Sequence, residues 1–395
     1  MKIFINNYSL ICSLGSTKEE VSKKLFSEKL LNDPKMYELV DKQVTPTFDI
    51  TCDLPAIPAE LAKYNSRNNQ FILKCLNDLS SEISGMIQKY GSSRIGVVFG
   101  TSTSGIDEGI KAMSSARDGK LPDKYDYSIQ EIGSPSSFIK EKLNLESIAY
   151  TISTACSSGA RAFIEGKNLI KNGICDVVIV GGSDSLNDLT LNGFHCLEAI
   201  SLKRTNPFSK NRTGINIGEG CALFLLTSEN LSQKPSLELL GAGESTDAYH
   251  ISSPDPSGEG AASAMKMALA QAKLEPSNID YINLHGTGTI KNDEMEAKAV
   301  SSLFKNTPVS STKPLVGHTL GAAGAIEAAF CALSLEKEYS NGSLPIHFFD
   351  GEEDEELEKL NFVKNKSNVS PLICMSNSYA FGGNNASLII GYNNG

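Results

Sequence analysis

The stretch "STACSSGARAFIE", residues 153–165, places Cys156 between a strand-like run and a helix-like run. The preceding segment, 147–153, has the β-branched composition of a buried strand, and the helical pattern that follows ends at Asn172-Gly173, a typical helix stop. A thiol at a helix N-terminus is stabilised as the thiolate by the helix dipole and by free N–H groups, which lowers its pKa. We therefore interpret Cys156 as a nucleophile rather than as a buried packing residue.

A later stretch resembles this one. "HTLGAAGAIE" (318–327) matches "CSSGARAFIE" (156–165), with glycine at the fourth position of each. Each stretch opens a predicted helix, which indicates a duplicated unit of about 200 residues. A chance match between two helix starts rich in small residues is the alternative. Polar residues around Pro235 mark the predicted boundary, which divides the chain into halves 1–235 and 236–395.

Short apolar runs bounded by glycine alternate with helix-like segments along the chain. This pattern predicts an α/β protein with largely buried strands. The first residues form a predicted strand and turn, and the further predicted strands are 94–100, 147–153, 175–182, 221–226, 281–286, 371–378 and 386–392. The predicted helices are 57–88, 158–172, 259–273, 292–305 and 322–337.

Composition excludes several classes of protein. The 395 residues carry 46 acidic and 36 basic side chains, a net charge of −10, which makes nucleic acid a poor partner. No segment reaches the roughly 18 uncharged apolar residues that cross a bilayer, since Glu327 interrupts the most apolar one. The start has no sustained hydrophobic region typical of an export signal. Nine scattered cysteines without metal-ligand spacing indicate reduced thiols in a cytoplasmic protein, with all except Cys156 buried and no metal bound.

The segment "YINLHGTGT" (281–289) ends a predicted strand with a histidine. Alternation along an extended chain places His285, Thr287 and Thr289 on one face, where they would line a substrate channel. A histidine that is merely hydrogen-bonded within a polar turn is the alternative.

Two more segments carry polar groups in apolar surroundings. In "STKPLVGHTLGAAGAIE" (311–327), His318 precedes the second helix, and Glu327 inside that helix needs a partner, for which Lys313 is the candidate. A water-exposed Glu327 is the alternative. The glycine-rich "SNSYAFGGNNASL" (376–388) would direct a backbone N–H at an oxyanion with Phe381 as a movable plug, or it is a simple hairpin connection.

Together these segments resemble the elongating β-ketoacyl-acyl carrier protein synthases of the thiolase-like fold, over nearly the whole chain. Two further stretches support the resemblance, "NPFSKNRTGINIGEGCALFLL" (206–226) and "ESTDAYHISSPDPSGEG" (244–260). The resemblance implies duplicated halves in α-β-α-β-α layers with two central mixed sheets. The N-terminal half would carry the nucleophilic cysteine, and the C-terminal half both histidines and the lysine.

The resemblance also implies a mechanism. Cys156 would accept an acyl chain from the phosphopantetheine thioester of an acyl carrier protein, with the backbone N–H groups of Cys156 and Phe381 as the oxyanion hole. His285 and His318 would stabilise the enolate formed by decarboxylation of a malonyl thioester, which then attacks the acyl-cysteine and adds two carbons. The supporting residues that orient the histidines would be Lys313, Glu327 and Glu296. The substrate-binding residues would be Thr287, Thr289, Thr103 and Gly382.

The implied partners are an acyl carrier protein and a second subunit, with no cofactor bound by the enzyme itself. The second subunit would be another copy of the chain or a related chain-length factor. Because the carrier is acidic, its docking site needs basic residues, and the candidates are Arg67, Lys203, Arg204, Lys210 and Arg212. The alternative function is that of a non-catalytic subunit that shapes the pocket of a sister synthase.

Particular residues separate this chain from its relatives. Chain-initiating synthases have Asn in place of His318, and degradative thiolases carry a second catalytic cysteine that is absent from the 376–388 segment. Several positions depart from the usual family pattern: Ile290 for Pro, "YAFGGNN" in the glycine-rich loop, Ser209 and Thr213 for acidic residues, and Thr103 at the acyl pocket. These departures point to a specialised pathway such as polyene or polyketide assembly, including the aryl polyenes.

Overall fold

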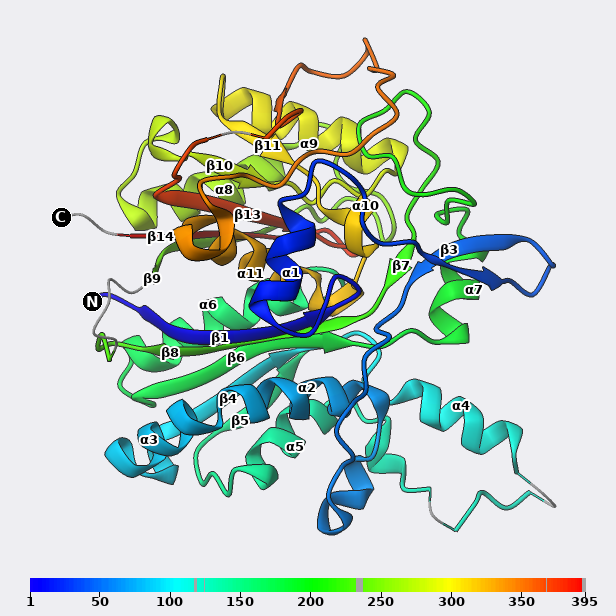
Figure 1. Ribbon diagram of the computed structural model, residues 1–395, viewed down its shortest axis with the longest axis vertical. Coiled ribbons are helices and arrows are strands. Elements are labelled where there is room, and N and C mark those ends of the chain that lie inside the picture. The colour runs from blue at the N-terminus through cyan, green and yellow to red at the C-terminus, as the bar shows by residue number, and fades with distance from the viewer. Residues whose placement is uncertain (117–118, 124, 232–236, 367, 393–395) are drawn as a thin grey trace.

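The structure is a computed structural model that describes residues 1–116, 119–123, 125–231, 237–366 and 368–392. The fold consists of one large sheet divided into two halves, three helical layers and a small outlying second sheet (Figure 1). The predicted boundary at 235 lies outside the described residues. Across the described part of the chain, every helix is too short or too polar to cross a membrane.

The sheet of the N-terminal half contains five strands in the order β1-β8-β6-β4-β5. They are β1 (Phe4–Cys12), β8 (Gly220–Thr227), β6 (Val177–Asp184), β4 (Ile95–Gly100) and β5 (Ala149–Ile152). Strand β4 runs parallel to β5 and β6, whereas β8 runs antiparallel to β6 and β1. Central strands β4, β6 and β8 are buried throughout, which explains their continuous apolar sequences.

The C-terminal half repeats this order as β9-β14-β13-β10-β11, with a short β12 added. These strands are β9 (Leu237–Thr246), β14 (Asn384–Gly391), β13 (Ile373–Tyr379), β10 (Tyr281–Asn283), β11 (Pro308–Ser310) and β12 (Asn361–Phe362). Strand β10 is parallel to β11 and β13, and β14 is antiparallel to β13 and β9, as in the first half. The repeated order and directions agree with duplication rather than with a chance match.

The two expected sheets are joined along one edge. Strands β1 and β9 pair antiparallel through only two residue pairs, Phe4 with Glu238 and Ile5 with Leu237, so the hydrogen-bonded sheet has eleven strands. We call this short junction the seam. The halves of the sheet lie on opposite sides of two central helices, α6 (Ser158–Lys171) and α11 (Ala323–Leu335) (Figure 1).

Outer helices complete the five layers. The N-terminal sheet is covered by α2 (Arg67–Asp78), α3 (Ser80–Tyr90) and α5 (Ser134–Lys142), and the C-terminal sheet by α8 (Glu259–Ala272) and α9 (Ile290–Leu303). The remaining helices are α1 (Lys18–Leu25), α4 (Ile106–Ser114), α7 (Asp188–Cys196), α10 (Lys313–Val316) and α12 (Lys337–Ser340). A second sheet contains β2 (Lys35–Glu38), β3 (Val44–Phe48) and β7 (Ile217–Gly218).

The central helices cross at small residues that contact each other reciprocally. A Cβ added to Gly159 would meet Ala325 N at 2.8 Å, and one added to Gly324 would meet Ala160 N at 2.7 Å. These reciprocal contacts show that Gly159 and Gly324 occupy equivalent positions in the two halves. Each is also the second residue of its helix, since α6 starts at Ser158 and α11 at Ala323. The register of the repeat therefore differs by three residues from the match read in the sequence, because a 3₁₀ turn at 320–322 precedes α11.

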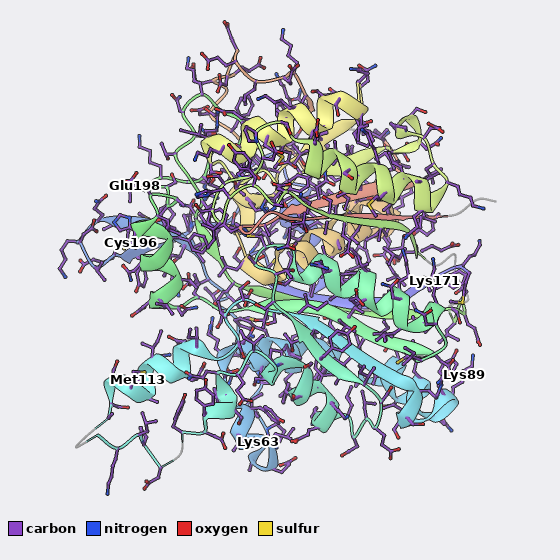
Figure 2. All side chains as sticks on the ribbon, turned by 180° about the vertical axis from the view of Figure 1, so that it is seen from behind. Lys63, Lys89, Met113, Lys171, Cys196 and Glu198 are labelled. Carbon is purple, nitrogen blue, oxygen red and sulfur yellow. The ribbon has the colours of Figure 1, made fainter. Side chains whose placement is uncertain are left out.

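Some predicted elements differ from the structure. The helix predicted over 57–88 divides into a 3₁₀ turn (Ala59–Tyr64), α2 and α3, because the Ser66 side chain accepts a hydrogen bond from Asn69 N–H and starts α2 anew. Strand β9 was not predicted. The prediction that eight cysteines are buried is wrong for two of them, since Cys52 and Cys196 are exposed, and Figure 2 shows Cys196 at the edge of the molecule.

Candidate active site

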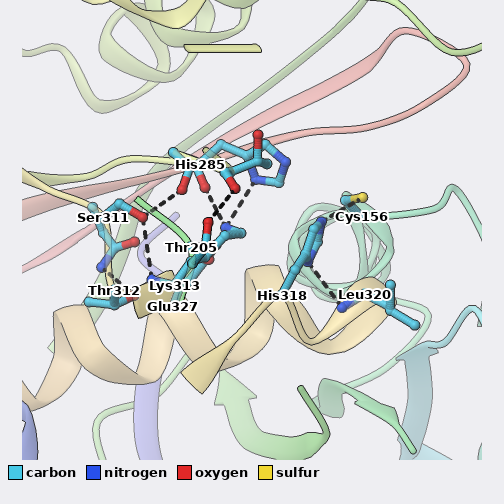
Figure 3. A network of polar contacts seen from close by, with 12 residues as sticks. Cys156, Thr205, His285, Ser311, Thr312, Lys313, His318, Leu320 and Glu327 are labelled. Atoms are coloured by element: carbon cyan, nitrogen blue, oxygen red, sulfur yellow. Dashed lines mark hydrogen bonds and ion pairs between the residues drawn. The ribbon is translucent and has the colours of Figure 1, made fainter. Parts of the chain in front are cut away.

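Cys156 lies at the point where β5 leads into α6. Ala155 has a left-handed φ of 50°, which makes the turn sharp and places the thiol before the first residue of the helix, Ser158. The thiol is buried and lines a cavity of about 430 Å³ together with His285 and His318. The Cys156 Sγ is 3.0 Å from His318 Nε2 (Figure 3). The structure thus brings together three residues that are far apart in the sequence.

The neighbours of His318 determine which ring nitrogen carries the proton. The backbone N–H of Leu320 donates to His318 Nδ1 over 3.1 Å, so the neutral ring carries its hydrogen on Nε2. Burial and the positive charge of Lys313 hold the pKa of His318 well below its ordinary value, so the ring is neutral near pH 7. His318 therefore directs an N–H donor at the thiol.

His285 follows β10, and its ring meets that of His318 edge to face, with centroids 5.3 Å apart. Lys313 Nζ is 3.4 Å from His285 Nδ1, and an ammonium group can only donate there. Burial, then Lys313 and His318, hold the pKa of His285 well below its ordinary value. The neutral ring consequently carries its hydrogen on Nε2, so the site holds two imidazole N–H donors.

Lys313 and Glu327 form the predicted buried pair. Lys313 Nζ is 2.6 Å from Glu327 Oε1, both side chains are at most 3% exposed, and Nζ also donates to the carbonyl oxygen of His285. Burial raises the pKa of Glu327, which the charge and hydrogen bond of Lys313 oppose. The alternative of a water-exposed Glu327 is wrong.

Glu296 contacts backbone rather than imidazole. Its carboxylate accepts from the backbone N–H groups of His285 at 2.8 Å and Gly286 at 2.7 Å, and burial raises its pKa to about 8. It fixes the loop that carries His285, and it can thus position this histidine through the backbone rather than through the ring. Asp293, which sequence reasoning missed, acts similarly by accepting from Phe208 N–H and Gly288 N–H.

The pKa expected for the nucleophile is also wrong. Burial raises the pKa of Cys156 to about 11, although Lys313 and the backbone N–H groups of Phe381 and Cys156 lower it. Packed elements cover the helix start on both sides. Desolvation of the thiolate therefore raises the pKa by more than the helix dipole lowers it. The two backbone N–H groups that lower the pKa are the pair expected to form an oxyanion hole.

Thr287 and Thr289 line the cavity as expected, and their hydroxyls are 2.9 Å apart. The predicted extended alternation does not bring them there. Gly286 and Gly288 have φ values of 39° and 79°, so the segment turns after β10 while both threonines still line the cavity.

Of the other residues expected at the substrate pocket, Phe381 lines the cavity, whereas Thr103 and Gly382 do not. Phe381 lines the cavity with its ring 5.8 Å from that of Phe194 on α7, a cavity residue that sequence reasoning missed because no helix was predicted there. Thr103 does not line this cavity, because its N–H and hydroxyl both bind the buried Asp184 carboxylate. Gly382 is exposed and donates its N–H to the Ile251 carbonyl, outside the cavity.

The basic residues predicted to dock the carrier protein differ in whether their charge is already paired within the chain. Arg67 does not present a free charge, since its guanidinium pairs with the buried Glu219. Four others border one surface hollow: Lys203, Arg204, Lys210 and Arg212. Arg212 is buried against Asp354, and Lys210 pairs with Glu352. Arg204 donates to two backbone carbonyls, and Lys203 is exposed with no ion pair in the described residues.

Comparisons with known proteins agree with this arrangement. The β-ketoacyl synthase N-terminal domain matches residues 46–231, and the β-ketoacyl synthase C-terminal domain matches residues 237–347. A putative mitochondrial 3-oxoacyl-[acyl-carrier-protein] synthase from Schizosaccharomyces pombe is 35% identical over 315 residues, 74% of this chain and 73% of the relative. The 3-oxoacyl-[acyl-carrier-protein] synthase 2 of Rhizobium meliloti is 36% identical over 257 residues, 61% of this chain and 60% of the relative.

A solved structure is similar over the whole chain. It is the ketosynthase (ApeO) in complex with its chain length factor (ApeC) from Xenorhabdus doucetiae, with a TM-score of 0.93 and 41% identity, covering 99% of this chain and 98% of that one. The two family domains together with these likenesses confirm the thiolase-like fold expected from the sequence. The chain belongs to the β-ketoacyl synthase family of condensing enzymes.

Proposed function

We propose that this chain transfers an acyl group from a carrier protein to Cys156 and condenses it with a malonyl group. The observation that carries the proposal is the meeting of the Cys156 thiol with two neutral imidazoles, each with its N–H on Nε2, in one buried cavity. A thiol supplies a nucleophile, and two uncharged donors suit an oxyanion that develops in a site with little water.

In the first step, the Cys156 sulfur attacks the thioester carbonyl of the incoming acyl chain. The tetrahedral oxyanion would be held by the backbone N–H groups of Cys156 and Phe381, both of which lower the pKa of the thiol. Collapse breaks the bond to the pantetheine sulfur, and the thiol proton passes to that leaving group. Because burial keeps Cys156 protonated near neutral pH, proton loss accompanies the attack rather than preceding it.

In the second step, a malonyl thioester loses carbon dioxide, and the electron pair of the broken bond forms an enolate. His285 and His318 donate to the enolate oxygen from Nε2. The enolate carbon attacks the acyl-Cys156 carbonyl, the carbon–sulfur bond breaks, and the Cys156 thiolate regains a proton from solvent. The product is longer by two carbons. The scheme uses only side chains and backbone groups and needs no bound cofactor.

Thr287 and Thr289 support binding of the pantetheine arm in this proposal. Their hydroxyls face the cavity beside His285 and can bond the amide groups of an extended arm.

The direct test of the proposed reaction is incubation with acyl- and malonyl-carrier protein, followed by mass analysis of the carrier-bound product. Wild type should form the β-ketoacyl product and Cys156→Ala should not. Identical behaviour of the two proteins would overturn the proposal.

For the partner subunit and the pathway, we propose a heterodimer with a chain-length factor that assembles a polyene. Support comes from the 41% identity to a ketosynthase that was solved with its chain length factor. Native mass spectrometry of the chain co-expressed with its neighbouring gene products distinguishes a heterodimer from a homodimer. Intact-mass analysis of the acyl group on Cys156 then identifies the pathway.

A non-catalytic role is the second candidate, suggested by the altered glycine-rich loop. The complete set of Cys156, His285 and His318 favours the enzyme instead. Stoichiometric labelling of Cys156 by an acyl thioester would exclude an inert subunit.

The acidic charge of a carrier protein requires basic residues at its docking site. We propose that Lys203 and Arg204, at the hollow beside the cavity, contact the acidic carrier protein, and that Arg67 does not. Lys203→Glu should raise the apparent KM for carrier-bound substrate with little change in kcat. Lys171→Glu is the matched control, because Lys171 lies at the opposite edge of the molecule from the cavity residue Glu198 (Figure 2). Equal KM values in the two variants would remove Lys203 from the docking surface.

A further inference from the structure

We propose that Cys156, His285 and His318 also form a binding site for a zinc-class divalent cation, and that Lys313 weakens this binding. One sulfur and two ring nitrogens, all buried, lie within 4.8 Å of one another. Zinc prefers this combination of cysteine and histidine ligands. Spacing along the chain does not reveal the site, because its ligands come from three separate loops.

The geometry of the three atoms is close to that of a metal site. Bonds of about 2.0 Å to nitrogen and 2.3 Å to sulfur place tetrahedral ligands roughly 3.4 Å apart. His318 Nε2 is already 3.0 Å from Cys156 Sγ, and the limit of 4.8 Å on the remaining separations leaves only small side-chain movements. The fourth position would face the cavity, where water or a substrate sulfur has room.

Binding requires protons to move. Cys156 Sγ releases its proton to solvent and becomes the thiolate ligand. Because Nδ1 of each ring already faces a donor, each histidine would bind the metal through Nε2, and its hydrogen would move from Nε2 to Nδ1. The ion itself is neither oxidised nor reduced, and the only product besides the complex is the released proton.

The groups around both rings oppose this shift. A metal-bound histidine normally donates its other ring N–H to a carboxylate or carbonyl. Here His285 Nδ1 faces the Lys313 ammonium at 3.4 Å, and His318 Nδ1 faces the Leu320 N–H at 3.1 Å. After metal binding each contact would join two donors. The arrangement that keeps both Nε2–H groups directed at the cavity therefore also weakens metal binding.

Of the two opposing donors, Lys313 can be removed by substitution. Its loss alone would leave Glu327 buried without its cation, so the test pairs Lys313→Met with Glu327→Gln. Without the ammonium group beside it, His285 Nδ1 would be free to carry the hydrogen that metal binding requires. We expect the dissociation constant for the metal to fall by about 10- to 100-fold in this double variant.

The experiment is a titration of the full-length protein with Co²⁺, followed by thiolate-to-cobalt charge-transfer absorption. This readout is independent of acyl transfer, so it stands even where the proposed reaction fails. We expect one cobalt per chain, loss of the band in Cys156→Ser, an unchanged band in the exposed-thiol control Cys196→Ser, and tighter binding in the double variant.

Three results would overturn the proposal. Absence of a saturable band in both wild type and the folded double variant, checked by circular dichroism, would remove the site. A band that is lost in Cys196→Ser and kept in Cys156→Ser would assign the metal to the surface. Equal dissociation constants in wild type and the double variant would remove the role of Lys313.

Discussion

The two halves of the molecule have the same strand order, yet the loops after equivalent strands carry different groups. After β5 the chain turns at once into α6 and presents Cys156, whereas after β11 it presents Lys313 and His318 before a 3₁₀ turn leads into α11. After β10 comes His285, whereas the equivalent loop after β4 contains Thr103, bound to Asp184. Duplication thus produced one site in which one half supplies the nucleophile and the other supplies the imidazole donors.

The two half-reactions share one cavity but use side chains from different halves of the molecule. The nucleophile of the acyl-transfer step comes from the N-terminal half, whereas the imidazoles that act on the malonyl unit come from the C-terminal half, which also supplies the Phe381 N–H to the oxyanion of the first step. Substitution of the nucleophile and substitution of an imidazole should therefore each abolish one step and leave the other.

The largest effect is expected for Cys156→Ala. Acyl transfer should cease, and the condensation rate should fall by about 10⁴-fold or more, because no other group can form the covalent intermediate. Decarboxylation of malonyl-carrier protein should continue, since the imidazoles remain. Release of labelled carbon dioxide and acylation of the protein measure the two steps separately. Loss of both steps together would contradict the division between the halves.

The reciprocal change is His285→Ala. Decarboxylation should fall by about 10²- to 10³-fold, the usual effect of removing one donor to an oxyanion. Acylation of Cys156 should be retained, and intact mass spectrometry measures it. A variant that decarboxylates normally and fails to acylate would place His285 in the other half-reaction.

The buried Lys313–Glu327 ion pair belongs to the C-terminal half alone, and substitution can break it. Lys313→Met should lower the free energy of unfolding by roughly 3–5 kcal/mol because Glu327 is left buried and unpaired. Adding Glu327→Gln should restore most of this stability without restoring decarboxylation. Denaturant unfolding and the carbon dioxide assay distinguish the two effects, and recovery of both would make the pair purely structural.

The reciprocal contacts of the central helices predict a smaller effect. Gly159→Ala should destabilise the protein by about 1–3 kcal/mol, because the added Cβ meets backbone atoms of Ala325 and Gly321 within 2.9 Å. Gly85→Ala on α3 is the matched control, with no atom within 4 Å of the added Cβ, and should be neutral or stabilising. Thermal melting of the two variants measures the difference, and equal melting temperatures would argue against close packing at this crossing.

The smallest expected effect concerns the thiol of the N-terminal half, whose protonation can be followed by the pH dependence of its alkylation. Because the pKa of Cys156 is raised to about 11, the thiolate fraction should grow about tenfold per pH unit between pH 7 and 10. Mass spectrometry of Cys156 after short exposure to iodoacetamide gives the rate. A rate that levels off near neutral pH would mean that the helix dipole, rather than burial, controls the thiol.

Sequence reasoning predicted the elements with strong periodicity and the residues with distinctive chemistry. The buried strands β4, β6 and β8, the central helices, Cys156, His285, His318 and the Lys313–Glu327 pair were all predictable, because each leaves a local signature. The carboxylate inside an apolar helix is the clearest case, since burial requires a partner.

What could not be predicted depends on contacts between distant segments. The charge of Arg67 is taken by Glu219, and Thr103 is held by Asp184, both on other elements. The raised pKa of Cys156 arises because packing of the two halves buries the helix start. The seam and the three-residue shift of the repeat likewise appear only when both halves are placed together.

The seam has a consequence for synthesis on the ribosome. Strand β1 emerges first but pairs along its length with β8, which ends at Thr227, so the first strand waits while most of the N-terminal half is made. Strand β9 also lacks its main partner when it is made. It pairs with β1 through only two residue pairs, and β14, with which it pairs along its length, is the last described strand. Two strand edges are therefore open in the growing chain, each a place where a neighbouring nascent chain can add.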